Sequence, residues 1–301
     1  MRTSQSTKTG GIAQENAATP PRLGRILAKT PLHIIVIIIC VIWLVPTVAL
    51  FVSSFRPVNL IATTGWWRAF LPPYNFTLNL YIHDLTQAGL GQSFLNSLFI
   101  TVPATIIPIM VAAFAAYAFA WMDFPGRNVL FVIVVALLVV PLQMTLIPVL
   151  RIFNKLHLSG TFPGIWLAHT GYGLPFAIYL LRNFFGNLPK DMLESAYLDG
   201  ASSYTAFFEL VLPTSIPAIA SLAIFQFMWV WNDLLVALIY LGSNPNLQPM
   251  TVNIANLVSS LGAGWQLLTA AAFLTMILPL IIFFALQRYF VRGILAGSVK
   301  G

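Results

Sequence analysis

Long apolar runs separated by short polar segments make up most of this chain. The runs cover residues 32–55, 95–121, 129–150, 165–182, 216–241 and 267–291. An α-helix needs roughly 20 apolar residues to cross a bilayer, and each run is close to that length. The fourth run is less regular, because polar and glycine residues at 169–173 interrupt it. The pattern therefore predicts an all-α polytopic membrane protein with six transmembrane helices.

The polar segments divide the chain further. Residues 1–31 are basic and rich in Ser, Thr, Gln and Asn, which predicts a flexible N-terminal arm. The apolar run that follows is longer than the 7–15-residue core of a signal peptide, so we expect it to remain as the first span. A transmembrane domain over 32–291 then ends in a polar tail at 292–301.

Composition excludes an ordinary soluble domain. Apolar residues make up 58% of the chain and charged residues 8%, with a mean hydropathy of +0.86, whereas soluble domains have roughly 25% charged residues. The net charge of +7 is therefore a sign of membrane orientation and not of nucleic-acid binding. Cys40 is the single cysteine, so the chain forms no internal disulfide.

The distribution of Lys and Arg favours one orientation. With both termini in the cytoplasm, eleven of the 15 basic residues lie in cytoplasmic segments. The four that fall outside are Arg56, Arg68, Arg151 and Lys155. Because cytoplasmic loops carry an excess of Lys and Arg, this orientation is the expected one. It places the long polar segment 187–217 in the cytoplasm.

Segment 187–217 reads as two short helices joined by a turn. Pro189 suits the first position of a helix, and Gly200 suits a left-handed residue after its last turn. Ser202 or Ser203 can cap a second helix, which we expect Pro213 and Pro217 to bring to an end. Helices this short are not stable alone, so the pair must pack against something.

The same segment resembles a known motif. Glu194-Ser195-Ala196, Asp199-Gly200-Ala201, Phe207 and Leu210-Val211-Leu212-Pro213 resemble the EAA motif of ABC-importer permeases, with Ser195 in place of the middle alanine. The resemblance implies a cytoplasmic coupling helix pair between spans 4 and 5 that fits a groove on an ATPase subunit. The coupling residues it implies are Glu194, Ala196, Asp199, Gly200, Ala201, Phe207, Leu212 and Pro213.

Each helix of the pair carries an apolar stripe, which we expect to fill the ATPase groove. The stripe residues are Met192, Leu193, Ala196 and Tyr197, followed by Tyr204, Phe207, Phe208 and Val211. A DNA-binding helix-turn-helix is the alternative, but the segment is acidic where phosphate binding needs basic residues.

One carboxylate lies clearly inside a predicted span. Asp233 follows Trp229 and Asn232 near the end of the fifth run, and charged groups in spans usually face the bundle interior or a wet cavity. Aromatic rings beside amides and carboxylates suit a sugar, so these three residues are candidates for the translocation pathway. The alternative is that Asn232 and Asp233 only tie helices together or contact interfacial water.

Two glycines and two outer segments also leave alternatives open. Gly171 and Gly173 can break the fourth helix or allow close helix packing, which we favour. The aromatic residues of segment 56–93 can form an interfacial belt or a docking surface for an extracytoplasmic binding protein. Segment 242–265 offers a similar surface.

Three further stretches resemble the sugar-importing branch of the family. They are Trp231-Asn232-Asp233, Leu247-Gln248-Pro249-Met250-Thr251-Val252 and Gln287-Arg288-Tyr289-Phe290-Val291-Arg292-Gly293. They imply the second permease subunit of a maltose or α-glucoside type importer in a bacterial plasma (inner) membrane. Its implied partners are a second homologous permease, two ATPase subunits, an extracytoplasmic sugar-binding protein, the sugar and the lipid bilayer.

Missing motifs bear on the mechanism. The chain has no G-x-x-x-x-G-K-[ST] phosphate loop, no H-E-x-x-H and no paired intramembrane carboxylates. We therefore expect no enzymatic activity, no metal site and no cofactor, with ATP and Mg²⁺ bound by the partner ATPase subunits. A secondary sugar carrier or channel that works without an ATPase is the alternative function, and a non-transporting scaffold is a third.

Overall fold

The computed structural model describes residues 22–242, 244–257, 264 and 266–298. All regular structure in these ranges is helical, which agrees with the predicted all-α class. The chain divides into two compact units, residues 1–50 and 51–301.

Helix α1 (Arg22–Ser54) makes up the described part of the first unit and enters the second with its last residues. It begins at Arg22, so residues 22–31, which were predicted to belong to the flexible arm, are helical. The rest of the predicted arm lies outside the described residues. Large apolar side chains between Leu32 and Leu50 are exposed all around the helix, as expected of a helix whose surroundings are lipid.

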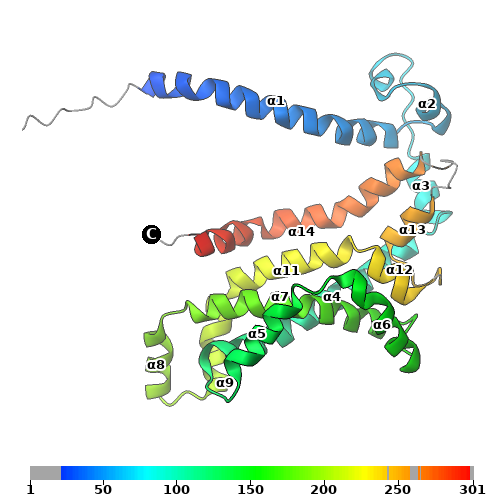
Figure 1. Cartoon of the computed structure of the whole chain (residues 1–301). Coiled ribbons are helices and arrows are strands. Elements are labelled where there is room, and N and C mark those ends of the chain that lie inside the picture. Colours follow the sequence, from blue (N-terminus) through cyan, green and yellow to red (C-terminus); the bar gives the residue numbers. More distant parts are fainter. Residues whose placement is uncertain (1–21, 243, 258–263, 265, 299–301) are drawn as a thin grey trace, which may run out of the picture. The chain divides into compact units, whose positions relative to one another are not determined.

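The second unit is built on a bundle of long helices. Helices α4 (Leu90–Trp121), α7 (Phe162–Gly186) and α11 (Ile216–Trp231) lie side by side, and α14 (Leu267–Ser298) packs along α11 (Figure 1). Small buried residues allow these helices to approach closely. They include Ala104, Ala112, Ala113, Ala116, Ala168, Ala177, Ala218, Ala270 and Ala271.

The predicted third span is not one continuous helix. Helices α5 (Arg127–Leu137) and α6 (Leu142–Lys155) meet at an angle of 102°. Pro141 immediately precedes α6; because proline disfavours a helical conformation in the residue before it, the chain breaks here. The predicted continuous helix over 129–150 is therefore wrong in this respect.

The predicted fifth span is also interrupted. Helix α11 ends at Trp231, and α12 (Leu235–Leu241) begins after a three-residue break that contains Asn232 and Asp233. Among the described residues, three helices are long and apolar enough to cross a membrane, within α1, α4 and α14. Up to five spans result if each of two bent helix pairs counts as one. The count of six remains a prediction.

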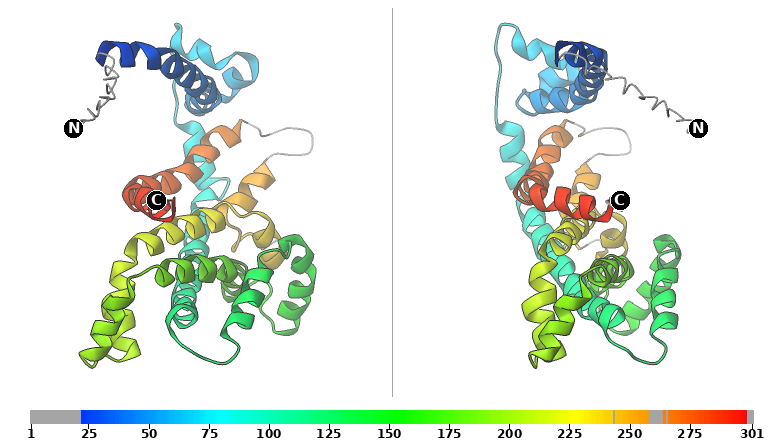
Figure 2. Two further views of the ribbon diagram at one scale, coloured as in Figure 1. Left: turned by 60° about the vertical axis from the view of Figure 1, so that its left-hand side comes forward. Right: turned by 90° about the vertical axis from the view of Figure 1, so that its left-hand side faces the viewer.

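Shorter elements complete the unit. Residues 56–89 form α2 (Val58–Thr63), the 3₁₀-helix η1 (Trp66–Phe70) and α3 (Asn79–Thr86), and α13 (Met250–Leu257) precedes α14. Asn96 Nδ2 ties the chain before α13 to α4 by donating to the carbonyls of Asn246 and Gln248, at 2.9 and 3.1 Å. Figure 1 shows α3 near one end of the long helices and the segment after α7 near the other, and both views of Figure 2 show the segment after α7 at the edge of the unit.

The C-terminal helix is longer than predicted. Helix α14 continues past 291 to Ser298, so most of the predicted polar tail is helical, and residues 299–301 lie outside the described residues.

Candidate functional site

Segment 187–217 forms the expected helix pair. Helix α8 (Lys190–Leu198) follows Pro189, and Gly200 adopts a left-handed φ of +87° after the last turn. Ser202 is the cap of the second helix, because its Oγ accepts a hydrogen bond from the Thr205 amide at 3.1 Å. The turn is therefore set by glycine and serine at the positions where the sequence predicted them.

The second helix of the pair ends between Pro213 and Pro217. Helix α9 (Ser203–Thr205) continues through a π-helical stretch, η2 (Ala206–Val211), into α10 (Leu212–Thr214). Only at Ser215 does the chain turn, by 72°, into α11. Pro213 lies inside this helical run, directly after the π-helical stretch, where i→i+5 hydrogen bonds replace the usual α-helical pattern. The helix ends at Thr214, between Pro213 and Pro217, as the sequence predicted.

Part of the apolar stripe packs against its own chain. Leu193, Phe207 and Val211 are at most 3% exposed and share one hydrophobic cluster with residues of α4 and α7. The Phe207 ring lies 5.0 Å from the Phe114 ring and 5.1 Å from the Tyr117 ring, measured between centroids. The expectation that the whole stripe faces a partner is wrong for these three side chains, because it assumed that the loop had no surface of its own chain to cover.

Other coupling candidates are accessible. Glu194, Asp199, Gly200 and Pro213 are exposed, and Ala196, Ala201 and Leu212 are half-buried. The most exposed apolar side chain of the loop is Leu198, at 89%. Sequence reasoning did not select it because it lies off the stripe of α8.

Two hydrogen bonds fasten this end of the bundle. The hydroxyls of Tyr117 and Tyr197 lie 3.0 Å apart, linking α4 to α8. Trp121 Nε1 donates to the Phe185 carbonyl at 3.1 Å, linking α4 to the end of α7. Segment 187–217 is thus joined to α4 by both apolar and polar contacts.

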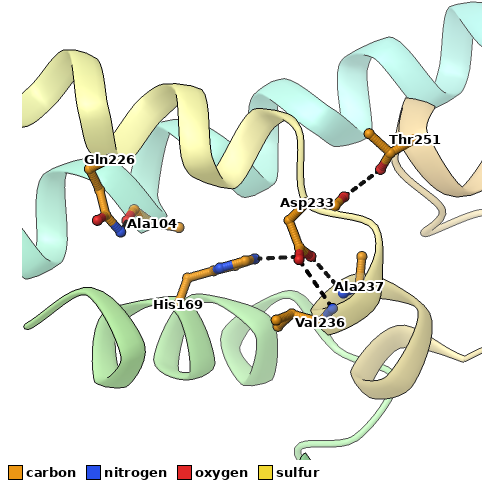
Figure 3. Close-up of polar contacts among 7 residues, drawn as sticks. All are labelled: Ala104, His169, Gln226, Asp233, Val236, Ala237 and Thr251. Carbon is orange, nitrogen blue, oxygen red and sulfur yellow. Dashed lines mark hydrogen bonds and ion pairs between the residues drawn. The ribbon is translucent and has the colours of Figure 1, made fainter. Parts of the chain in front are cut away.

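The break between α11 and α12 contains Asp233, the carboxylate that the sequence placed within a span. Asp233 caps α12, since its carboxylate accepts hydrogen bonds from the amides of Val236 and Ala237 at 3.2 and 2.9 Å (Figure 3). Its backbone carbonyl accepts from Thr251 Oγ1 of α13 at 2.5 Å. Asn232 is exposed, and its Nδ2 donates to the Met228 carbonyl. Asp233 therefore ties elements together, as the alternative interpretation expected.

A histidine of α7 lies beside this carboxylate. His169 is 1% exposed, and its Nε2 lies 3.8 Å from Asp233 Oδ2 (Figure 3). The Trp229 ring contacts the imidazole edge-on, with centroids 5.3 Å apart. The sequence contained a signal for this pair, an ionisable side chain within each of two apolar runs, but not their proximity.

A cavity of about 280 Å³ opens next to Trp229, between α7 and α11. Its lining is mostly aromatic and consists of Tyr172, Gly173, Phe176, Phe225, Gln226 and Trp229. Gln226 donates through Nε2 to the Ala104 carbonyl of α4 at 3.1 Å (Figure 3). Helix α7 runs unbroken through both glycines, and a Cβ at Gly173 would meet the Gln226 amide at 2.6 Å. Gly173 therefore serves close packing.

Comparison with known proteins identifies the family. Residues 108–296 match the family described as "Binding-protein-dependent transport system inner membrane component". The chain is 60% identical over 275 residues to the osmoprotective compounds uptake permease protein of Synechocystis, covering 90% of this chain and 92% of that protein. It is 57% identical over 241 residues to the alpha-glucoside transport system permease protein of Rhizobium meliloti, covering 78% of this chain and 63% of that protein.

A solved structure shares the fold. It is the crystal structure of a bacterial ABC transporter involved in the import of the acidic polysaccharide alginate, with a TM-score of 0.73 at 23% identity. The match covers 90% of this chain and 99% of that chain. By its sequence and its fold, the chain belongs to the family of inner membrane components of binding-protein-dependent transport systems, and it is a multi-pass membrane permease subunit.

Proposed function

We propose that this chain is the permease subunit of an ATP-driven sugar importer whose substrate is an oligosaccharide or an α-glucoside. The observation that carries the proposal is the 57% identity to a permease named for α-glucoside transport. The relative with 60% identity is named for osmoprotective compounds, so an osmoprotective compound is the second candidate substrate class.

The cavity beside Trp229 supports a pathway role for this part of the chain. Aromatic rings such as Tyr172, Phe176 and Trp229 can cover the C–H face of a sugar, and an amide such as Gln226 can take its hydroxyls. In this proposal Asn232 and Asp233 belong to the same pathway, with Asp233 holding the start of α12 in place. A second, homologous permease subunit would supply the other half.

The exposed part of segment 187–217 is the proposed point of energy input. ATP would be hydrolysed by two separate ATPase subunits that dock on this loop from the cytoplasm. Leu198 would enter a groove on an ATPase, and Glu194 and Asp199 would make polar contacts at its edge. Phe207 would transmit the movement to α4, because its ring packs on Phe114 and Tyr117. The helices would then alternate between inward and outward access as rigid bodies.

The proposed orientation places both termini in the cytoplasm and a sugar-binding protein on the outer side. Eleven of 15 basic residues on the cytoplasmic side support it. The location of α3 and segment 187–217 at opposite ends of the long helices also fits (Figure 1).

The first test is a pull-down of the tagged chain in mild detergent, with mass spectrometry and an ATPase assay of what co-purifies. We expect an ATPase and a second permease, with ATPase activity stimulated by one binding protein and its ligand. Recovery of this chain alone, with sugar flux in vesicles that lack ATP, would instead establish the secondary carrier, which the named relatives do not favour.

The substrate class needs its own measurement. The purified complex is reconstituted in vesicles, and uptake of radiolabelled maltose, isomaltose and maltotriose is followed in the presence of ATP and the binding protein. Accumulation of at least one of these α-glucosides is expected. If none accumulates while an osmoprotective solute does, the α-glucoside assignment is wrong and the second class replaces it.

A further inference from the structure

A small cavity lies in the segment that follows α1. It has a volume of about 110 Å³ and is bounded by α2, η1 and the chain after η1. Its polar lining comes from Arg56, Thr64, Arg68 and Asn75. None of the residues that line it is acidic, so two guanidinium groups share this cavity without a carboxylate.

Arg56 is a buried part of the cavity wall. Only 3% of the residue is exposed. Its Nη1 donates to the Thr64 carbonyl at 3.3 Å, and its Nη2 donates to the Leu60 carbonyl at 3.2 Å and to Thr64 Oγ1. These bonds use three of the five N–H groups of a guanidinium. Burial lowers the pKa of Arg56, as expected for a cation that has lost water without gaining a counter-charge.

Arg68 supplies the second positive charge. It is exposed, and its side chain makes no hydrogen bond or ion pair among the described residues. Large exposed side chains lie close to it along the chain: Trp67 is 60% exposed, Phe70 58% and Tyr74 65%. Arginine with exposed Trp, Tyr and Phe is the composition of the centre of a protein interface.

The charge of the surrounding surface has one sign. In the outer segment 56–93 the only acidic residue is Asp84, which is fully buried, and the basic residues are Arg56 and Arg68. A partner that docks here therefore meets positive charge and no exposed carboxylate. An acidic side chain is the matching group, since arginine pairs with carboxylates through two parallel hydrogen bonds.

We propose that this cavity, which we call the Arg56–Arg68 pocket, receives an aspartate or glutamate side chain of the extracytoplasmic binding protein. Arg56 forms the fixed wall, and Arg68 closes over the carboxylate from the rim. The inference rests on the proposed orientation, which puts the pocket on the outer side. A binding-protein-dependent permease requires a protein partner on that side, which favours an acidic protein side chain over a lipid phosphate.

The test measures how much binding protein the transporter needs. The complete complex is placed in nanodiscs, and its ATPase activity is titrated with the binding protein that co-purifies with it, loaded with its ligand. The half-maximal concentration is compared for the wild type, Arg68→Lys and Arg68→Glu. Arg68 is the better probe, because Arg56 also holds α2 in place and its variants risk misfolding. Lys155→Glu, an exposed charge reversal elsewhere on the same proposed side, is the matched control.

Arg68→Glu should raise the half-maximal concentration by about tenfold and abolish its rise with salt, because the reversal places two carboxylates opposite each other. Arg68→Lys should raise it less, because lysine keeps the charge but not the two parallel hydrogen bonds, and Lys155→Glu should stay close to wild type. Glu→Arg and Asp→Arg variants of the binding protein are then scanned against Arg68→Glu. One of them should bring the half-maximal concentration back toward the wild-type value, because it restores a pair of opposite charges.

Three results separate the possibilities. An unchanged half-maximal concentration in Arg68→Glu, with the wild type still stimulated, would overturn the pocket and leave the proposed function intact. A defect that appears with anionic phosphatidylglycerol but vanishes in pure phosphatidylcholine would identify a lipid phosphate as the occupant and also overturn it. A wild-type complex that no binding protein stimulates would overturn the proposed function itself.

Discussion

Gly200 allows the coupling proposal to be tested without disturbing the packing of the bundle. Its φ of +87° lies in the left-handed region, and a Cβ built on it would meet no atom within 4 Å. A side chain at this position therefore adds backbone strain and no steric clash. For an L-residue the left-handed conformation costs roughly 1–2 kcal/mol, and a β-branched residue suffers more than others.

The strain predicts the size of the effect. A difference of about 1.4 kcal/mol corresponds to a tenfold change in an equilibrium constant. If ATPase docking requires the observed turn, Gly200→Ala should weaken it by about tenfold. Gly200→Val should weaken it further and abolish uptake. Gly200→Asn should stay near wild type, because asparagine tolerates this conformation better than other residues.

The assay compares ATPase-subunit binding in detergent with sugar uptake in vesicles, at matched levels of permease in the membrane. Gly186→Ala is the control: that glycine also has open space around it but no positive φ, and it lies at the end of α7. Its uptake should equal that of the wild type. Normal ATPase binding and uptake by Gly200→Val would refute the coupling role of this turn.

Three further predictions concern other parts of the chain. Gly173→Ala should lower the thermal stability of the detergent-solubilised complex, because its Cβ would displace the Gln226 amide, whereas Gly171→Ala, with open space, should not. Burial raises the pKa of Asp84 from 3.8 to about 6, despite the opposing effect of neighbouring His83. The unfolded chain therefore loses this proton at a lower pH than the folded chain. The free energy of unfolding should then fall as the pH rises from about 4 to about 6 and stay level above that. Asp84→Asn should remove that fall in melting temperature and be more stable than wild type at pH 8, and a wild-type-like profile would contradict the account. Asp233→Ala should cost roughly 0.5–2 kcal/mol through loss of the α12 cap, which a lower melting temperature would reveal, and an unchanged one would contradict.

The sequence predicted those features that depend on neighbours along the chain. Apolar runs of sufficient length indicated the long helices, and the chemistry of Gly200 and Ser202 indicated the turn and the cap. The break before α6 was also encoded locally, by Pro141, but the apolar run concealed it because hydropathy does not register a proline.

Features that depend on distant contacts were beyond the pattern. Phe207 belongs to an apolar stripe with helical spacing on a short amphipathic helix. Nothing in the local sequence distinguishes a stripe that packs on α4 from one that binds a partner. His169 and Asp233 are separated by 64 residues, so only the packing of α7 against the start of α12 brings them to 3.8 Å. The same limit explains why Leu198, which stands off the stripe, was missed.

The burial of Leu193, Phe207 and Val211 has a mechanical consequence. A loop held to a bundle only by its two ends would absorb a push by bending, and little of the force would reach the helices. Here any displacement of the loop relative to α4 would open a void in a close-packed apolar interior, which is costly. The loop and this end of α4 and α7 should therefore move together as one rigid body. The flexibility required for movement must lie elsewhere, for example at the 72° turn at Ser215.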